Sequence, residues 1–436
     1  MADKKQAPVP SSRIGRFVRV VKLAGGVTGG MVAEGSRRWR RGEGLKPRDL
    51  LLTASNARRL TDELANMRGA AMKLGQMLSM DTGDLLPKEL TDILARLRSD
   101  GVEMPPEQLD KAMNLAYGED WQALFYGFDH APIAAASIGQ VHRAYAPDGS
   151  EIALKIQYPG VAKSIGSDVD NIASLLNLAG IFPKGFDIKP LLKAAKEQLA
   201  SEADYLEEAD HLASFGRLLA DDSRFLVPQV FKELTRENVL VMSYIDSQPI
   251  EVVADLPQAD RDRVVTALFD LMLMEFFELR LVQTDPNFAN YRYRATGGEV
   301  VLLDFGATRK FKASFVNGYK RLVGAGLRGD DEGVMAAAAK LGYIVDQPDD
   351  GYRDLLSKVF SLVMEPLLAD EPYDFGRSDL SARMNALGDS VWEFRDAWQA
   401  PPTDAVFFHR KVGGMFMLAA RLKASVNLCE LIQTRI

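Results

Sequence analysis

The sequence predicts an α+β fold with two lobes, a small lobe rich in strands and a larger helical lobe, preceded by a helical extension. Three observations support this prediction. Helical periodicity runs through residues 45–130, and two strand-like runs flank a Pro-Asp-Gly turn within 138–158. After Pro257 the pattern is mostly helical to the end of the chain, with the DFG region as an interruption. The 436 residues are 47% apolar, which is enough for the core of a two-lobed domain.

These patterns divide the chain into four segments. We expect a flexible basic leader over residues 1–44, the helical extension over 45–130, the strand-rich lobe over 131–246 and the helical lobe over 247–436. The most apolar long run, 264–282, also contains acidic and basic residues. It is therefore predicted to be a buried amphipathic helix rather than a membrane span.

Basic residues are concentrated near the start of the chain. Ten Lys and Arg residues lie between 13 and 48, against two Glu residues, and the apolar, glycine-rich stretch 23–33 separates two basic clusters. Such a segment fits contact with an anionic membrane surface, and it equally fits a solvated, flexible arm; both interpretations stay open. It lacks the apolar core of a secretory signal.

Cysteine and histidine usage argues against two classes of site. Cys429 is the single cysteine, so the chain has no disulfide framework. The four histidines stand far apart in the sequence, without the spacing of metal ligands. A zinc site is therefore not expected.

Two short runs carry residues suited to phosphoryl transfer: VQTDPNFANY at 282–291 and VLLDFGATR at 301–309. The first has Asp and Asn in the D-x-x-x-x-N spacing of a protein-kinase catalytic loop, and the second contains a DFG. Upstream, Lys155 in IALKIQY resembles the strand lysine of kinases. Phosphoryl transfer needs oxygen ligands for Mg²⁺, a carboxylate near the attacking group and a cation on the phosphates. The order of these motifs predicts a protein-kinase-like fold that binds ATP between its lobes.

Two further segments are expected to contact the nucleotide. The run 134–140 stands where a kinase has its glycine-rich loop, but alanines restrict the approach of the backbone to phosphates. The run VLVMSYI at 239–245 is typical of a strand that enters a hinge, with Met242 as gatekeeper. The residues expected at the nucleotide are Ala134, Ala135, Ala136, Ser137, Ile138, Gly139, Gln140, Met242, Ser243, Tyr244 and Ile245.

Several motifs together resemble the UbiB family. They are MKLGQML at 72–78, AAASIGQVHRA at 134–144, the acidic pair in Glu202-Ala-Asp204 and the DPNFAN loop. The family consists of atypical kinase-like proteins, also called aarF-domain-containing kinases, that are required for ubiquinone biosynthesis. The QTDP form of the loop and the runs KIQYPGV and LLDFGATR look more like the mitochondrial branch. The resemblance extends from about residue 50 to the end of the chain.

The resemblance implies a role for each matched residue. Lys155 would contact the α- and β-phosphates of ATP or ADP, with Glu208 as its helix partner. Asp285 would be the catalytic-loop aspartate. Asn290 and Asp304 would hold Mg²⁺.

The resemblance also implies a cover over the nucleotide site. A helix of the extension with Lys73, Gly75 and Gln76 would pack over the site and pair with Glu202 and Asp204. No A-P-E follows the DFG at the usual interval, so the platform that receives a peptide substrate is missing. The resulting prediction is an atypical kinase-like fold with its N-terminal extension packed over the active site.

The residues alone leave some of these assignments open. Glu207 competes with Glu208 as the partner of Lys155. Without the resemblance, the Lys73 and Gln76 side chains would be read as a solvated helix face, and the acidic residues that follow position 200 as an exposed acidic helix.

The predicted function is that of a Mg-ATP-binding ATPase that supports ubiquinone biosynthesis at a membrane surface. A small-molecule or lipid kinase with a hydroxyl acceptor and a non-catalytic, nucleotide-gated scaffold are the alternatives. Expected partners are ATP, an anionic membrane surface and quinone-pathway enzymes or lipid precursors; nucleic acid is not expected, and a homodimer is left open. The expected location is peripheral, at the inner membrane face, in the cytoplasm of a bacterium or on the matrix side of a mitochondrion.

Overall fold

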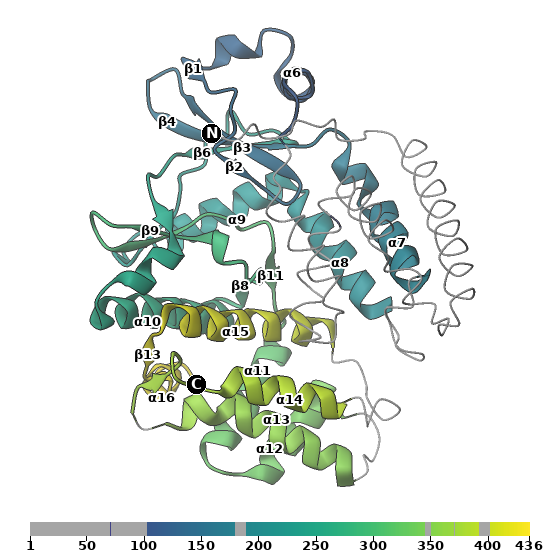
Figure 1. Ribbon diagram of the computed structural model, residues 1–436, viewed down its shortest axis with the longest axis vertical. Coiled ribbons are helices and arrows are strands. Elements are labelled where there is room, and N and C mark those ends of the chain that lie inside the picture. Colours follow the sequence, from purple (N-terminus) through teal and green to yellow (C-terminus); the bar gives the residue numbers. More distant parts are fainter. Residues whose placement is uncertain (1–69, 71–102, 179–188, 345–349, 370, 392–401) are drawn as a thin grey trace, which may run out of the picture. The chain divides into compact units, whose positions relative to one another are not determined.

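The chain divides into two compact units, Met1–Asp210 with Gln229–Tyr244 and His211–Pro228 with Ile245–Ile436. The second unit thus includes residues 211–228, which the sequence analysis assigned to the small lobe. The leader and most of the helical extension lie outside the described residues. The computed structural model, shown in Figure 1, describes residues 70, 103–178, 189–344, 350–369, 371–391 and 402–436.

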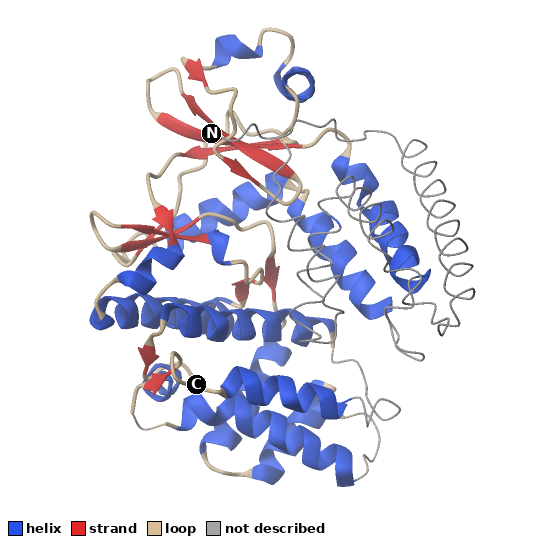
Figure 2. Ribbon diagram, viewed as in Figure 1, coloured by secondary structure: helices blue, strands red, loops and turns tan. Residues whose placement is uncertain are grey.

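The first unit is built on an antiparallel sheet of the order β1-β3-β4-β6, with β2 added beside β3 (Figure 2). Strand β4 is buried along almost its whole length, as expected for a central strand. The elements of this unit are α6 (Pro106–Tyr117), a 3-10 turn (Trp121–Leu124), β1 (Gly127–Phe128), β2 (Ala134–Ala135), β3 (Gly139–Tyr145), β4 (Glu151–Gln157), α7 (Val161–Leu178), α8 (Lys189–Glu202), the first part of α9 (Tyr205–Leu218) and β6 (Val239–Ser243).

The hairpin predicted around Pro-Asp-Gly is β3–β4. Gly139 pairs with Gln157 at its open end and Tyr145 with Glu151 next to the turn. The turn closes with Gly149 at a φ of +80°, a conformation that glycine adopts without steric cost.

The second unit is mainly helical, with short strands between its first helices. Its elements are the end of α9, β5 (Phe225–Leu226), β7 (Gln248–Pro249), a 3-10 helix (Ile250–Asp255), α10 (Gln258–Met274), a π-helical segment (Glu275–Leu279), β8 (Leu281–Gln283), a 3-10 turn (Phe288–Asn290), β9 (Tyr291–Arg294), β10 (Glu299–Leu302), β11 (Thr308–Lys310), α11 (Ala313–Leu327), α12 (Asp331–Leu341), α13 (Asp350–Leu368), β12 (Tyr373–Asp374), α14 (Leu380–Val391), α15 (Thr403–Leu422), β13 (Ser425–Val426) and α16 (Leu428–Gln433).

Helix α10 and the π-helical segment that follows account for most of the apolar run 264–282, and the prediction of a buried helix there is confirmed. Nearly all side chains from Val264 to Leu273 are buried. Helix α15, from much later in the chain, runs beside α10 (Figure 1). The π-helical segment is followed by Arg280, which has a φ of +54°, and β8 begins at the next residue. The chain therefore leaves the buried helix through a sharp turn directly into the strand that precedes the catalytic-loop motif.

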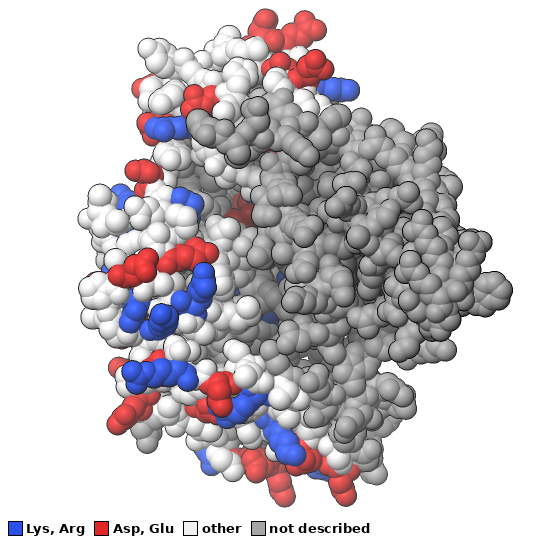
Figure 3. Space-filling model, in the orientation of Figure 1, with Lys and Arg blue, Asp and Glu red and all other residues white. Residues whose placement is uncertain are grey.

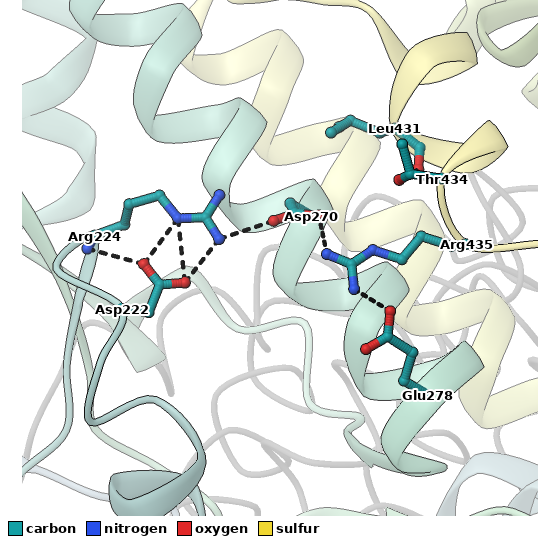
Figure 4. Close-up of polar contacts among 7 residues, drawn as sticks. All are labelled: Asp222, Arg224, Asp270, Glu278, Leu431, Thr434 and Arg435. Carbon is teal, nitrogen blue, oxygen red and sulfur yellow. Dashed lines mark hydrogen bonds and ion pairs between the residues drawn. The ribbon is translucent and has the colours of Figure 1, made fainter.

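Asp270 ties helix α10 to two other parts of the second unit. Its carboxylate accepts hydrogen bonds from Arg224, at 2.8 Å, and from Arg435 near the end of the chain (Figure 4). Arg224 is also held by Asp222, and Arg435 by Glu278. One buried carboxylate between two guanidinium groups keeps both charges compensated, and it fastens the last turn of the chain to the helix.

Charges on the drawn face of the described residues are mixed in sign. Figure 3 shows lysine and arginine side chains next to aspartate and glutamate side chains rather than apart from them. Within the described part of the chain, no helix is both long enough and apolar enough to cross a membrane.

Candidate functional site

Lys155 and Glu208 form a buried ion pair in the first unit. The Lys155 ammonium donates to both carboxylate oxygens of Glu208, at 2.8 and 2.9 Å. Only 7% of the lysine and 1% of the glutamate are exposed, and the ring of Tyr205 lies 5.3 Å from the lysine nitrogen. A lysine held in this way keeps one position, which suits a cation that has to meet a phosphate.

The start of α9 explains why Glu208 rather than Glu207 meets the lysine. The carboxylate of Asp204 accepts a hydrogen bond from the backbone N–H of Glu207 at 3.0 Å, the geometry of a helix N-cap. With the helix beginning at Tyr205, Glu208 lies on the buried side, whereas Glu207 is exposed.

The two acidic residues expected to hold the cover lie in different surroundings. Glu202 is 6% exposed and accepts a hydrogen bond at 3.3 Å from a glutamine one turn earlier on α8. Asp204 is exposed and caps α9. Lys73, Gly75 and Gln76 lie outside the described residues, so the covering helix stays a prediction.

The alanine-rich segment forms the hairpin β2–β3. Ala134 and Ala135 pair with β3 and are exposed. The Ala136 N–H donates to the Gly139 carbonyl at 2.9 Å, which closes the turn at Ser137 and its neighbour. This hairpin is the segment predicted to cover the phosphates, and it has alanine methyl groups where glycine would leave the backbone bare.

The last three residues of the alanine-rich segment, 138–140, are buried in the sheet. Ile138 and Gln140 are each 2% exposed, and the Gln140 amide is hydrogen-bonded to the His142 ring at 2.7 Å. A Cβ on Gly139 would lie 2.2 Å from the Ile156 carbonyl oxygen, so glycine is what allows β3 and β4 to pair there. Ile138 and Gln140 were expected at the nucleotide, and their burial leaves only their backbone to reach it.

Ala136→Gly is expected to change the relative affinities for ATP and ADP. Removal of the methyl group at the turn lets the backbone approach the phosphates and loosens the hairpin. Affinities can be measured by calorimetry, with Ala131→Gly, at an exposed position just before the hairpin, as control. Unchanged ATP and ADP affinities in Ala136→Gly would count against this hairpin as the phosphate cover.

The expected hinge follows β6, and two of its backbone N–H groups already donate hydrogen bonds to other parts of the protein. Met242, the predicted gatekeeper, is 6% exposed. The Ser243 N–H donates to the Gln229 carbonyl at 2.8 Å, and the Tyr244 N–H donates at 2.9 Å to a carbonyl at the start of β4. Adenine would therefore have to bind through other groups of the segment, such as those of Ile245.

Two antiparallel ribbons place the motifs of the second unit side by side. Strand β8 pairs with β11, and β9 pairs with β10. The loop with the D-x-x-x-x-N motif connects β8 to β9, and the loop with the DFG connects β10 to β11. The Thr284 N–H donates to the Ala307 carbonyl, and the Leu303 N–H donates to the Asn290 carbonyl, both at 3.1 Å. These bonds fix the two loops against each other.

The polar side chains of the two loops are held by hydrogen bonds within their own loops. The Asn290 amide donates to Oδ2 of Asp285 at 3.1 Å, and both residues are at least nine-tenths buried. Asp304 is half-buried, and its Oδ1 accepts from the Gly306 N–H at 3.1 Å. The arrangement brings together the predicted catalytic aspartate and the amide predicted to bind the metal.

The aromatic residue of the DFG is part of the core. Phe305 is 2% exposed, and its ring centroid lies 4.6 Å from that of Phe215 on α9. Within the second unit, the last part of α9 thus supplies a packing surface for the DFG.

The chemistry of these side chains fits Mg²⁺. Carboxylate and amide oxygens are the ligands that this ion prefers, and in nucleotide sites it takes only one or two protein ligands because phosphates and water supply the rest. The Asn290 amide is held through its nitrogen, which orients its oxygen for a cation. No cluster of three or more His, Cys, Asp or Glu side chains suited to a metal occurs among the described residues.

A second buried polar cluster, missed by the sequence analysis, adjoins the loops. Lys411 of α15 lies 2.9 Å from the Tyr291 hydroxyl, 3.4 Å from Oε1 of Gln283 and 3.3 Å from Oε2 of Glu275. All four residues are at most 5% exposed. The sequence did contain a signal for this cluster. It is the run HRKVGG at 409–414, which places charged residues and two glycines within an apolar helix.

This cluster shares a small cavity with the predicted metal ligands. The cavity has a volume of about 10 Å³, close to the space that one water molecule occupies. Its polar lining includes Glu275, Gln283 and Lys411 on one hand and Asn290 and Asp304 on the other.

Burial shifts the ionisation of the buried cluster. It raises the pKa of the Glu275 carboxyl to about 7, although Lys411 opposes the shift. For Lys411, burial alone would lower the pKa, but Glu275 and Tyr291 outweigh it and leave the pKa above its ordinary value. Lys411 is therefore a permanent buried cation next to the loops.

Comparison with known proteins gives one family and several close relatives. Residues 96–338 match the ABC1 atypical kinase-like domain. Over 98% of the chain, 36% of residues are identical to the mitochondrial atypical kinase coq-8 of Caenorhabditis elegans, of which the chain spans 58%. Identity is 37% to atypical kinase COQ8B of Rattus norvegicus and 35% to atypical kinase COQ8 of Saccharomyces cerevisiae, both mitochondrial. Each match covers 98% of this chain, and the chain spans 81% and 86% of these two relatives.

A solved structure supports the fold. The complex of Rv3197 with erythromycin from Mycobacterium tuberculosis aligns with a TM-score of 0.60 over 88% of this chain and 96% of the other. The two sequences are 22% identical, so the likeness concerns the fold alone.

Proposed function

Because the chain belongs to the family of ABC1 atypical kinase-like domains, on its mitochondrial-type branch, we propose that it is a Mg-ATP-binding ATPase that supports ubiquinone biosynthesis at a membrane surface. The observation that carries the proposal is the joined pair of loops in the second unit. The Asn290 amide is bonded to Asp285, and the backbone of this loop is bonded to that of the DFG loop. This supports the proposal, because kinase-like phosphoryl transfer uses a catalytic-loop aspartate together with an asparagine and a DFG aspartate that bind the metal.

Each residue has a definite part in the proposed reaction. Lys155, fixed by Glu208, would neutralise the phosphates of ATP. Asn290 and Asp304 would hold Mg²⁺, which stabilises the charge that develops on the transferred group. Asp285 would orient the attacking oxygen and accept its proton.

The acceptor decides between hydrolysis and group transfer. The test is an assay with ATP labelled on the γ-phosphate, run with and without anionic liposomes and phenolic quinone precursors. Release of labelled inorganic phosphate alone supports the ATPase. Label transferred to lipid or precursor would instead identify a small-molecule or lipid kinase, and nucleotide binding without turnover would overturn the enzymatic proposal in favour of a scaffold.

The basic leader is proposed to make the membrane contact, on the inner membrane face. Deletion of residues 1–41 is expected to reduce sedimentation with cardiolipin-containing liposomes, because clustered Lys and Arg side chains are attracted to anionic headgroups. Sedimentation of the full chain should also fall at high salt, where these charges are screened. Liposomes of neutral lipid are the control. Equal pelleting of the full and shortened chains would reject the proposal.

A further inference from the structure

We propose that helix α15 positions the catalytic loop, through Gly414 against Pro286 and through Lys411 among the residues that flank the loop. This inference deepens the proposed function, and it concerns residues far from the recognised motifs in the sequence. Gly414 and Lys411 stand three residues apart and so share one face of α15.

The contact at Gly414 leaves no room for a side chain. A Cβ there would lie 2.2 Å from Cβ of Pro286, the residue directly after the catalytic-loop aspartate. A proline ring cannot turn away as a long flexible side chain would, so the loop or the helix would have to move. Gly414 therefore sets how closely the loop and the helix approach.

Lys411 holds the strands on both sides of the loop. It binds the Gln283 side chain, at the end of β8, and the Tyr291 hydroxyl, at the start of β9. Asp285 and Asn290 lie between these two strand residues in the sequence. One buried cation thus fixes both ends of the loop, and Glu275 compensates its charge.

The same face of α15 is anchored elsewhere, so it can serve as a fixed support. Asp404 accepts a hydrogen bond from Arg309 of β11 at 3.0 Å, and the Arg309 guanidinium lies 4.5 Å from the Phe407 ring centroid. On the adjoining face, the Phe408 ring stacks on Phe276 with centroids 3.7 Å apart. The residues 404, 407, 411 and 414 follow the spacing of one helical stripe.

The cavity beside the cluster suggests how the support reaches the metal ligands. Gln283 Nε2 is buried and has no hydrogen-bond partner among the described residues, and the cavity that Gln283 lines also borders Asn290 and Asp304. The Lys411 cluster therefore borders the same small space as both predicted metal ligands. Lys411 and Gly414 are thus positioning residues, because neither has to touch ATP.

The test compares two adjacent glycines in the full-length protein. Gly414→Ala inserts a methyl group against Pro286, whereas a Cβ on Gly413 would meet nothing within 4 Å. Gly414→Ala is expected to lower kcat for ATP hydrolysis about ten- to a hundredfold, since displacement of catalytic groups by about 1 Å has effects of this size. The Mg²⁺ concentration needed for half-maximal nucleotide-induced stabilisation should rise several-fold, while KM changes little. Gly413→Ala should match the wild type in activity and equal or exceed it in Tm.

Hydrogen exchange of the ligand-free protein gives a readout that does not depend on any activity. The amides of Thr284 and Leu303, which donate hydrogen bonds from one loop to the other, report the position of the two loops. They should exchange faster in Gly414→Ala than in Gly413→Ala. Equal exchange in both variants would overturn the inference, whatever the wild type does with ATP. A wild type without nucleotide binding would refute the proposed function and leave the exchange comparison to decide the inference.

A double-mutant cycle guards against a variant that is merely destabilised. Pro286→Gly removes the atom that the new methyl group would strike. If the contact carries the effect, Gly414→Ala should accelerate loop exchange much less in the Pro286→Gly background than in the wild type. An equal acceleration in both backgrounds would contradict a direct contact.

Discussion

Asp304→Asn is expected to abolish the Mg²⁺-dependent stabilisation by nucleotide and to lower ATP hydrolysis at least about a hundredfold, since metal ions supply several kcal/mol of charge stabilisation to such transition states. The substitution removes the negative charge of a predicted metal ligand but keeps its shape. An amide oxygen can still accept the hydrogen bond that the Gly306 N–H donates to Asp304. The DFG turn should therefore stay in place.

Thermal unfolding with and without Mg-ADP measures the effect. At about 100 times its Kd, a ligand that binds only the folded state adds about 2.7 kcal/mol of stability, which is easily detected. Asp374→Asn is a matched control, because Asp374 likewise accepts a hydrogen bond from the N–H of a glycine two residues on, at 2.9 Å. Asp374→Asn should keep the full shift. The same shift in Asp304→Asn would remove Asp304 from the magnesium site.

The sequence contained the catalytic-loop and DFG motifs, because each is a local run of residues. The ribbons that hold them were not predicted: the segment 247–436 was expected to be helical, and the pairing of β8 with β11 and of β9 with β10 comes from the structure. The choice of Glu208 over Glu207 was also within reach. Tyr205, Glu208, Leu212 and Phe215 form one buried helical stripe, and Glu207 lies off it.

The inward direction of Gln140 could have been read from strand periodicity. Gln140, His142 and Ala144 alternate with more exposed residues along β3, and all three are buried. The motif match favoured the nucleotide for Gln140, whereas the pleat of the strand directs its side chain into the sheet interior. The occupied N–H groups of Ser243 and Tyr244 were out of reach, because their acceptors come from other segments.

The support by α15 could not be predicted from sequence patterns. Lys411 contacts residues more than a hundred positions earlier, and no periodicity within one helix tells which distant loop it will meet. A lysine within an apolar helix indicates a buried partner, but its identity depends on how helices pack. The same holds for Gly414, whose need for a small residue is visible only once Pro286 lies against it.

Lys155→Met is expected to destabilise the protein by roughly 3–5 kcal/mol, the usual cost of removing one partner of a buried ion pair. The carboxylate of Glu208 is 1% exposed and would lose the ammonium that now binds both of its oxygens. Glu208→Gln should cost a similar amount, because it leaves the lysine charge buried without the carboxylate. The double variant Lys155→Met with Glu208→Leu should regain much of the loss, since a buried pair can be replaced by apolar groups of similar size at little cost.

Stability and nucleotide binding should separate in this series, which distinguishes a functional pair from a structural one. Urea unfolding measures the stability of each variant, and the Mg-nucleotide thermal shift measures nucleotide binding. The double variant should be nearly as stable as the wild type. It should still fail to bind nucleotide, because it lacks Lys155, the cation proposed to contact the phosphates. Lys232→Met is the matched control, since Lys232 forms an exposed pair with Asp210 at 2.9 Å and such pairs contribute about 0–1 kcal/mol. A double variant that binds Mg-nucleotide like the wild type would show that Lys155 serves the fold alone. If Lys155→Met loses no more free energy of unfolding than Lys232→Met, burial of the Lys155–Glu208 pair has no energetic consequence.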